Sequence, residues 1–235
     1  MNTSFQQVAV IGAGAMGRGI AQIAAQAGSQ VFLYDTQLEA TEKALTAVHQ
    51  VWDTLASKGR LDTATVAKYK SHLHAAQSLQ DLKPCDLIVE AIVERLDIKK
   101  SLFVELENLV SESTVLVTNT SSLSITAIAA ALQRPSQFAG YHFFNPVPLM
   151  KVVEVIAGLK TNPDVCARLT EFAKQMGHTP VQANDTPGFI VNHAGRGYGT
   201  EALRIVSEGV ADFATIDRIL KDQVGFKLGP FELFD

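Results

Sequence analysis

A glycine-rich turn near the amino terminus constrains the fold of this 235-residue chain more than any other feature. Residues 8–11 (VAVI) form an apolar run as long as a buried parallel strand, and Gly12, Gly14 and Gly17 follow it in the spacing GxGxxG. Gly12 permits a tight turn, Gly14 lets the backbone approach a pyrophosphate, and Gly17 lets the next helix pack closely on the strand. The pattern predicts a strand, a phosphate-binding turn and a helix.

The segment after the turn completes the pattern of a dinucleotide-binding unit. A helix runs to Gly28, a second apolar run covers residues 31–34, and Asp35 follows Gly17 by 18 residues, close to the ~20 of such units. Backbone N–H groups at the helix start are expected to hold the pyrophosphate. Because the Asp35 carboxylate accepts ribose hydroxyls and repels a 2′-phosphate, NAD is favoured over NADP. The expected cofactor-binding residues here are Gly12, Gly14, Ala15, Met16, Gly17 and Asp35.

Composition restricts the class of protein. Apolar residues make up 47% of the chain, enough for a core, and a formal net charge of −4 offers no basic field for nucleic acid or an anionic membrane surface. The first ten residues lack the pattern of a signal peptide, and no apolar run approaches the ~18 residues of a membrane span. Cys85 and Cys166 have no partner at metal-ligand spacing, so we expect reduced thiols, no metal site and a cytoplasmic protein.

Strands and helices alternate through the middle of the chain. We expect strands at 86–90, 114–118 and 180–183, and helices at 38–56, 64–73, 97–110, 125–132 and 164–176. Lys58 lies between the first two of these helices, which form a hairpin expected to project from the sheet edge. By itself, Lys58 is most simply a solvated charge, since exposed lysines are common. Asn119 and Ser121 follow the strand at 114–118, at the ligand-binding edge of such a sheet. Turn and N-cap roles are equally open for both.

The pattern changes after residue 137. Residues 138–144 and 151–156 are two strand-like runs joined by a short segment with two prolines, which predicts an antiparallel or irregular pair added to the parallel sheet. Pro187-Gly188 marks a domain boundary, and helices are expected at 189–206 and 215–222. The expected fold is a doubly wound, mostly parallel α/β domain at residues 1–186. The beginning of an all-α domain, incomplete, follows at residues 187–235.

His142 and Glu154 lie on the two strands of that predicted pair. If the chain folds back at the prolines, the carboxylate can meet the imidazole. A neutral His142 would then remove a proton from a substrate hydroxyl while Glu154 selects its tautomer and stabilises the imidazolium. The alternative is a strand histidine bonded to a backbone carbonyl and a surface glutamate, and spacing alone leaves both open.

Six segments, in order, resemble the 3-hydroxyacyl-CoA dehydrogenase family. They are VAVIGAGAMGRGIA (8–21), VEAIVERLDIKKSLF (89–103), TNTSSLSIT (118–126), YHFFNPVPLMKVVEV (141–155), DTPGFIVN (185–192) and GPFEL (229–233). The resemblance implies a Rossmann-type NAD-binding domain, a following helical domain, and NAD-dependent oxidation of an L-3-hydroxyacyl-CoA to the 3-ketoacyl-CoA. The family's helical domain continues beyond GPFEL and supplies its usual dimer interface, so the resemblance implies a truncated chain and a homodimer of the full-length protein.

The resemblance also implies catalytic roles. It makes His142 the catalytic base and Glu154 its partner. Ser121 would hydrogen-bond the substrate oxygen, and Asn192 would lie near His142 or the substrate carbonyl. Hydride passes directly to the nicotinamide, so no metal is implied.

Further residues are implied to bind the cofactor and the acyl-CoA. The residues implied near the nicotinamide half are Glu94, Lys99 and Asn119. Lys58 matches a basic residue that contacts the CoA phosphates in such enzymes. His193 and Val51 depart from the family pattern, where arginine and, in some members, a CoA-contacting serine stand.

For acyl-CoA oxidation, the motifs are most similar to bacterial phenylacetate-pathway members, which favours an intermediate such as a 3-hydroxyadipyl-CoA as the substrate. Two other functions remain open beside this one. A related enzyme could act on a free hydroxy acid such as L-gulonate. A non-catalytic, crystallin-like dinucleotide-binding protein is the third possibility. It is disfavoured because a binding protein needs none of His142, Glu154, Ser121 and Asn192.

Overall fold

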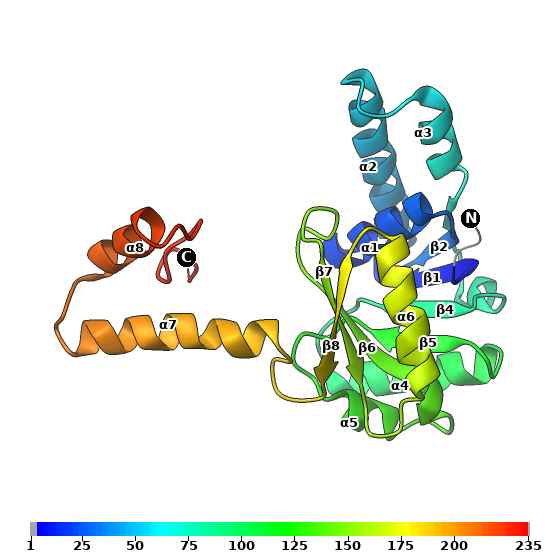
Figure 1. Cartoon of the computed structure of the whole chain (residues 1–235). Helices are drawn as coiled ribbons and strands as arrows, with labels where there is room; N and C mark the ends of the chain where they lie inside the picture. The colour runs from blue at the N-terminus through cyan, green and yellow to red at the C-terminus, as the bar shows by residue number, and fades with distance from the viewer. Residues whose placement is uncertain (1–3, 235) are drawn as a thin grey trace. The chain divides into compact units, whose positions relative to one another are not determined.

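A computed structural model describes residues 4–234. The chain divides into two compact units, of which the first ends at Pro187 and the second begins at Gly188. Figure 1 shows the elements of both units, and each unit is described by itself below.

The first unit is built on an eight-stranded sheet with the strand order β3-β2-β1-β4-β5-β6-β7-β8 (Figure 1). The strands are β1 (Gln7–Ile11), β2 (Gln30–Tyr34), β3 (Leu73–Ala75), β4 (Leu87–Glu90), β5 (Val115–Thr118), β6 (Phe138–Phe143), β7 (Val152–Ala157) and β8 (Thr179–Asn184). Strands β1 to β6 are parallel, β7 pairs antiparallel with β6, and β8 runs parallel to β7. The predicted mostly parallel sheet with added antiparallel strands is confirmed.

Helices cover both faces of this sheet. They are α1 (Ala15–Ala27), α2 (Leu38–Ser57), α3 (Thr63–Lys70), α4 (Leu96–Leu109), α5 (Ile125–Ala129) and α6 (Pro163–Gln175), with short 3₁₀ turns at Leu79–Leu82 and Pro135–Gln137. Because side chains alternate along a strand, Val8 and Val10 join one core with Ile20 of α1 and Phe172 of α6. Residues of opposite parity face α4, where the rings of Phe103 and Phe138 meet edge to face at 4.7 Å. The sheet is therefore doubly wound.

The glycine turn joins β1 tightly to α1. Gly12 has φ +102°, and a Cβ built on it would lie 2.4 Å from the carbonyl oxygen of Ala91. A Cβ at Gly17 would lie 1.8 Å from the carbonyl oxygen of Gly12, whereas a Cβ at Gly14 meets no atom within 4 Å. Helix packing therefore requires Gly12 and Gly17, and open space lies beside Gly14.

Two predicted helices end earlier than expected. The helix predicted at 64–73 ends at Lys70, because Leu73 begins the short edge strand β3 and pairs with Val31 of β2. The helix predicted at 125–132 ends at Ala129 as α5. After it, the N–H groups of Ala131 and Leu132 donate to carbonyls three residues back, as in a tight turn.

Helices α2 and α3 form an arm that projects from the sheet, as predicted (Figure 1). The arm packs against the main core, since Trp52 is fully buried in the same apolar cluster as Val10 and its ring lies 5.6 Å from that of Tyr69. Asp62 caps α3 by accepting a hydrogen bond from the Thr65 N–H at 2.7 Å. Lys58 follows α2 at the tip of the arm and is exposed.

Asp185 organises the start of α5 from a distant part of the sequence. Its carboxylate accepts hydrogen bonds from the N–H groups of Ile125 at 2.9 Å and Thr126 at 2.8 Å, and from the Ser124 hydroxyl at 2.9 Å. Burial by itself would raise the pKa of Asp185. The hydrogen bonds from Thr126, Ile125 and Ser124 outweigh that effect, so the pKa lies below its usual value.

The second unit contains α7 (Val191–Ser207) and α8 (Phe213–Asp222). The Asp217 carboxylate of α8 accepts hydrogen bonds from the N–H groups of Phe231 at 2.9 Å and Glu232 at 3.1 Å, which fold the GPFEL segment back onto that helix. A Cβ at Gly199 would lie 2.5 Å from the Phe234 ring, which explains a glycine inside α7. Within residues 4–234, no helix is both long enough and apolar enough to cross a membrane.

The glycine contact makes a prediction about stability. Replacing Gly17 with alanine should lower the free energy of unfolding by about 2–3 kcal/mol, because the added methyl group meets backbone. The Gly14→Ala variant is the matched control and should change it by less than about 0.5 kcal/mol, since the space there is open. Urea denaturation followed by circular dichroism measures both. Equal stability of the two variants would contradict this account of the turn.

The cap at α5 makes a prediction about pH. A carboxylate with a depressed pKa stabilises the folded state above its unfolded pKa and loses that contribution as pH falls through its folded pKa. The Asp185→Asn variant should therefore be about 1 kcal/mol less stable than the native chain at pH 7. The difference should shrink below about pH 4. Denaturation across this pH range tests it, with Glu112→Gln at an exposed loop carboxylate as a control that shows no such difference.

Candidate active site

Asp35 lies beside the glycine turn, as its place after β2 predicts. One carboxylate oxygen accepts a hydrogen bond from the Ala13 N–H at 2.8 Å, and the other accepts one from the Gln37 N–H at 3.0 Å. Asp35 therefore braces the turn through the backbone. Because each carboxylate oxygen has two lone pairs, acceptor capacity remains for hydroxyl groups of a ligand.

The structure brings His142 and Glu154 together. They are directly paired across β6 and β7, so their side chains lie on the same face of the sheet. His142 Nδ1 lies 2.6 Å from Glu154 Oε2, and the two residues are 5% and 0% exposed. With the Nδ1 proton donated to the carboxylate, the ring carries its basic lone pair on Nε2. The pair has the arrangement of an oriented general base.

Asn119 supports the strand that carries His142. Its backbone N–H donates to the Glu90 carbonyl at 2.8 Å, and its side-chain Oδ1 accepts from the Phe143 N–H at 2.8 Å. Phe143 follows His142 directly. Asn119, which was expected near the nicotinamide, thus links the ends of β4, β5 and β6 through its backbone and its side chain.

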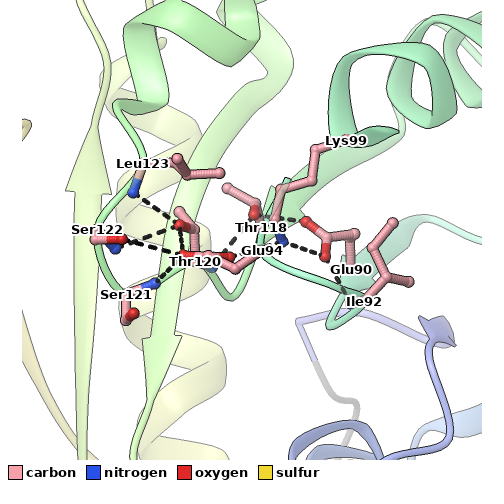
Figure 2. Close-up of polar contacts among 9 residues, drawn as sticks. All are labelled: Glu90, Ile92, Glu94, Lys99, Thr118, Thr120, Ser121, Ser122 and Leu123. Atoms are coloured by element: carbon pink, nitrogen blue, oxygen red, sulfur yellow. Dashed lines mark hydrogen bonds and ion pairs between the residues drawn. The ribbon is translucent and has the colours of Figure 1, made fainter. Parts of the chain in front are cut away.

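A buried ion-pair network lies at the carboxyl ends of β4 and β5 (Figure 2). Lys99 Nζ lies 2.5 Å from Glu90 Oε1 and 3.2 Å from Glu94 Oε2. Glu90 also accepts hydrogen bonds from the Ile92 N–H at 2.7 Å and the Thr118 hydroxyl at 2.6 Å. Three donors therefore satisfy a carboxylate that is completely buried.

Glu94 connects this network to the loop that contains Ser121. The same Glu94 oxygen accepts hydrogen bonds from the Thr120 hydroxyl, from the Ser121 N–H at 3.1 Å and from the Ser122 hydroxyl at 3.4 Å (Figure 2). Burial raises the pKa of Glu94, but the Thr120 hydrogen bond and the charge of Lys99 outweigh it and hold the pKa below its usual value. Glu94 is ionised at neutral pH.

The sequence-based prediction did not identify three residues of this network, Glu90, Thr118 and Thr120. Glu90 was read only as the end of an apolar strand. An acid that closes a buried strand is itself a signal, because an unpaired buried charge is costly. Its partner Thr118 follows from the strand register, since Glu90 is paired with Thr118.

The other predicted site residues are placed as follows. Lys99 is only 1% exposed and contacts the carboxylates of Glu90 and Glu94, and its place near a nicotinamide stays a prediction. Lys58 lies at the tip of the arm. Asn192 belongs to α7 of the second unit, and its place near His142 stays a prediction.

A cavity of about 380 Å³ opens between α1, α2 and the turn after β6. Its walls are mostly apolar, and its polar side chains are Arg18, Gln22 and Asn145.

In residues 4–234, no group of three His, Cys, Asp or Glu side chains has the arrangement to hold a metal ion. Burial raises the pKa of the Cys85 thiol to about 12, helped by the nearby Asp86 charge, which makes this thiol a poor nucleophile.

Comparison with known proteins gives the same family for both units. Residues 7–186 match the model of the 3-hydroxyacyl-CoA dehydrogenase NAD-binding domain, and residues 188–235 match the model of the C-terminal domain of that family.

Individual relatives agree with the domain matches. The chain is 45% identical over 235 residues to 3-hydroxyadipyl-CoA dehydrogenase of Escherichia coli, covering all of this chain and 50% of the relative. It is 42% identical over 229 residues to 3-hydroxybutyryl-CoA dehydrogenase of Clostridioides difficile, covering 97% of this chain and 82% of that protein.

A solved structure shares the fold. The crystal structure of 3-hydroxybutyryl-CoA dehydrogenase from Escherichia coli superimposes with a TM-score of 0.95 at 45% identity, covering 99% of this chain and 49% of that one. The chain thus spans about half the length of both Escherichia coli proteins. On the match of residues 7–186 and 188–235, the chain belongs to the 3-hydroxyacyl-CoA dehydrogenase family.

Proposed function

We propose that this chain carries out the NAD-dependent oxidation of an L-3-hydroxyacyl-CoA to the 3-ketoacyl-CoA. The observation that carries the proposal is the buried His142–Glu154 pair, with 2.6 Å between Nδ1 and Oε2, in a domain that matches the family's NAD-binding model. A buried and oriented histidine can serve as the general base in alcohol oxidation, because the hydroxyl proton must leave as hydride leaves C3.

The proposed mechanism assigns one step to each residue. His142 accepts the proton of the substrate hydroxyl on Nε2, and Glu154 stabilises the imidazolium that forms. Ser121 donates a hydrogen bond to the substrate oxygen, and Asn192 acts near His142 or the substrate carbonyl. Bound NAD would supply the nicotinamide ring that takes up the hydride from C3.

The glycine turn and two strand ends are proposed to hold the cofactor. Gly14, Ala15 and Met16 present backbone N–H groups to the pyrophosphate, with Gly12 and Gly17 shaping the turn. Asp35 accepts the adenosine ribose hydroxyls, and its charge favours NAD over NADP. Glu94 and Asn119 are proposed to contact the nicotinamide half of the cofactor. Lys99 is proposed to act on it through its ion pair with Glu94.

The proposed substrate has an anionic CoA portion and a short acyl portion. Lys58 contacts the CoA phosphates from the arm, and the cavity beside Arg18 receives part of the acyl-CoA chain. The relatives' names supply the acyl groups to test first, 3-hydroxyadipyl and 3-hydroxybutyryl.

Domain organisation, assembly and compartment are proposed on separate grounds. We propose residues 1–186 as the NAD-binding domain and residues 187–235 as part of the substrate and dimerisation domain. Apolar side chains exposed on the second unit, among them Phe213, Ile219 and Phe226, support a homodimer. Cys85 and Cys166 are free thiols in the described part of the chain, which supports a location in the reducing cytoplasm.

Substitution of the proposed dyad tests the reaction. His142→Gln and Glu154→Gln should each lower kcat on the order of 10²- to 10⁴-fold, because the first removes the base and the second removes the charge that orients it. NADH formation with L-3-hydroxybutyryl-CoA and L-3-hydroxyadipyl-CoA is the measurement. The dissociation constant of NADH should stay within about twofold, since neither residue lies at the glycine turn.

Two results would contradict the proposal. A native chain that binds NADH but oxidises none of these acyl-CoA substrates would favour a non-catalytic dinucleotide-binding protein. Turnover of L-gulonate in place of the acyl-CoA substrates would favour a free hydroxy acid as the substrate.

Substitution of Lys58 tests the CoA contact. The Lys58→Ala variant should raise KM for acyl-CoA about 3- to 10-fold with little change in kcat, and the effect should weaken with added salt, because the contact is an exposed charge pair. Lys43→Ala, on an exposed part of the same arm, is the control and should behave like the native chain. An unchanged KM in Lys58→Ala would leave this residue as a solvated charge.

A further inference from the structure

We propose that Glu90 is a buried positioning residue that fixes the loop at residues 120–122, and with it Ser121, through Lys99 and Glu94. The inference rests on the proposed function for what Ser121 does in the reaction. The connection from Glu90 to the loop rests on the contacts alone (Figure 2).

Glu90 has the properties of an anchor. It is the last residue of β4, in the centre of the sheet, and it is 0% exposed. Its carboxylate is fixed from three directions, by the Lys99 ammonium, the Ile92 N–H and the Thr118 hydroxyl. Since Thr118 is paired with Glu90 in the sheet, this bond is set by strand register and does not depend on any loop.

Lys99 transmits that position outward. Its side chain comes from α4 and is 1% exposed, with Nζ between Glu90 and Glu94. A buried ammonium needs carboxylate partners, so its distance to the anchored Glu90 restricts where Glu94 can lie. Glu94 itself has a side chain that is 39% exposed, and its ion pair with Lys99 ties it to the buried anchor. A second link to the loop runs from Glu90 through the Thr118 hydroxyl, which accepts a hydrogen bond from the Thr120 N–H at 3.3 Å.

Glu94 in turn shapes the loop. One of its oxygens accepts from the Thr120 hydroxyl, the Ser121 N–H and the Ser122 hydroxyl. The Thr120 oxygen accepts from the N–H groups of Ser122 at 3.3 Å and Leu123 at 2.9 Å. The Glu94 carboxylate therefore contacts the loop on both sides of Ser121.

The contacts separate positioning from cofactor binding. Lys99 is enclosed by carboxylates, so any influence of Lys99 on a bound ligand must pass through Glu94 and the loop. Glu94 and the loop are the outward end of the network, and Glu90 is its inward end. Removal of either end should release the same loop.

Hydrogen exchange of the loop tests the connection without any ligand. The Glu94→Gln variant, and the double variant Glu90→Gln with Lys99→Met, should each speed amide exchange in a peptide covering residues 119–124 by about 10-fold. The double variant removes both buried charges together, so neither is left unpaired. Lys100→Met makes the same substitution at the next residue and should exchange like the native chain.

The pattern across variants decides the inference. Combining all three substitutions should add little to the exchange caused by Glu94→Gln, because the Glu90–Lys99 pair acts on the loop chiefly through Glu94. Native-like loop exchange in the double variant would overturn the proposal, as would faster exchange spread equally over β6 to β8.

Kinetics give a second readout. In the double variant kcat should fall about 10-fold while KM for acyl-CoA stays within about threefold, because Ser121 would be misplaced for the transition state more than for binding. An equal change in kcat of Lys100→Met would overturn the proposal. If the native chain shows no turnover, the proposed function fails, and the exchange measurement still decides the role of Glu90.

Discussion

The close contact between Gly12 and Gly17 sets the position of everything else at the carboxyl edge of the sheet. Without a Cβ at either residue, α1 lies directly on the turn after β1. Two residues further along the same helix, a Cβ at Gly19 would lie 2.8 Å from the Val147 Cβ, so the turn that follows His142's strand packs against α1 as well. One helix thereby brings the proposed pyrophosphate turn and the exit of β6 side by side.

Buried charge is concentrated at this same edge. Glu90, Lys99, Glu154 and His142 are each at most 5% exposed, and every one of them has a partner of complementary chemistry within 2.6 Å. Removing ionisable groups from water is costly, and such pairs are weak contributors to net stability. Their concentration where parallel strands end is typical of a functional site, where geometry outweighs stability.

The fold was largely predictable from periodicity and glycine spacing. Apolar runs such as residues 8–11 and 31–34 identify buried strands, since both faces of the sheet are covered. The three-residue strand β3 was missed because its stabilisation comes from pairing Leu73 with Val31, not from a local pattern. The end of α5 was placed too late for a similar reason, because the chain enters a tight turn that its apolar residues do not signal.

The candidate site was predictable only where spacing or motif resemblance pointed to it. His142 and Glu154 were identified from two strand-like runs and a proline turn, and Asp35 from its distance to the glycines. Glu90 and the position of Lys99 were not, because they depend on the register of β4 with β5 and on the reach of a side chain from α4.

The sequence by itself determined the parallel α/β fold, the glycine turn and the residues with suitable chemistry, because strand length, helix period and the absence of a Cβ are local properties. Only the tertiary structure decided that His142 meets Glu154, that Asn119 holds Phe143, and that Glu94 connects a buried anchor to Ser121. These contacts join residues 12 to 27 positions apart. At such separations, strand register and packing decide which polar groups meet.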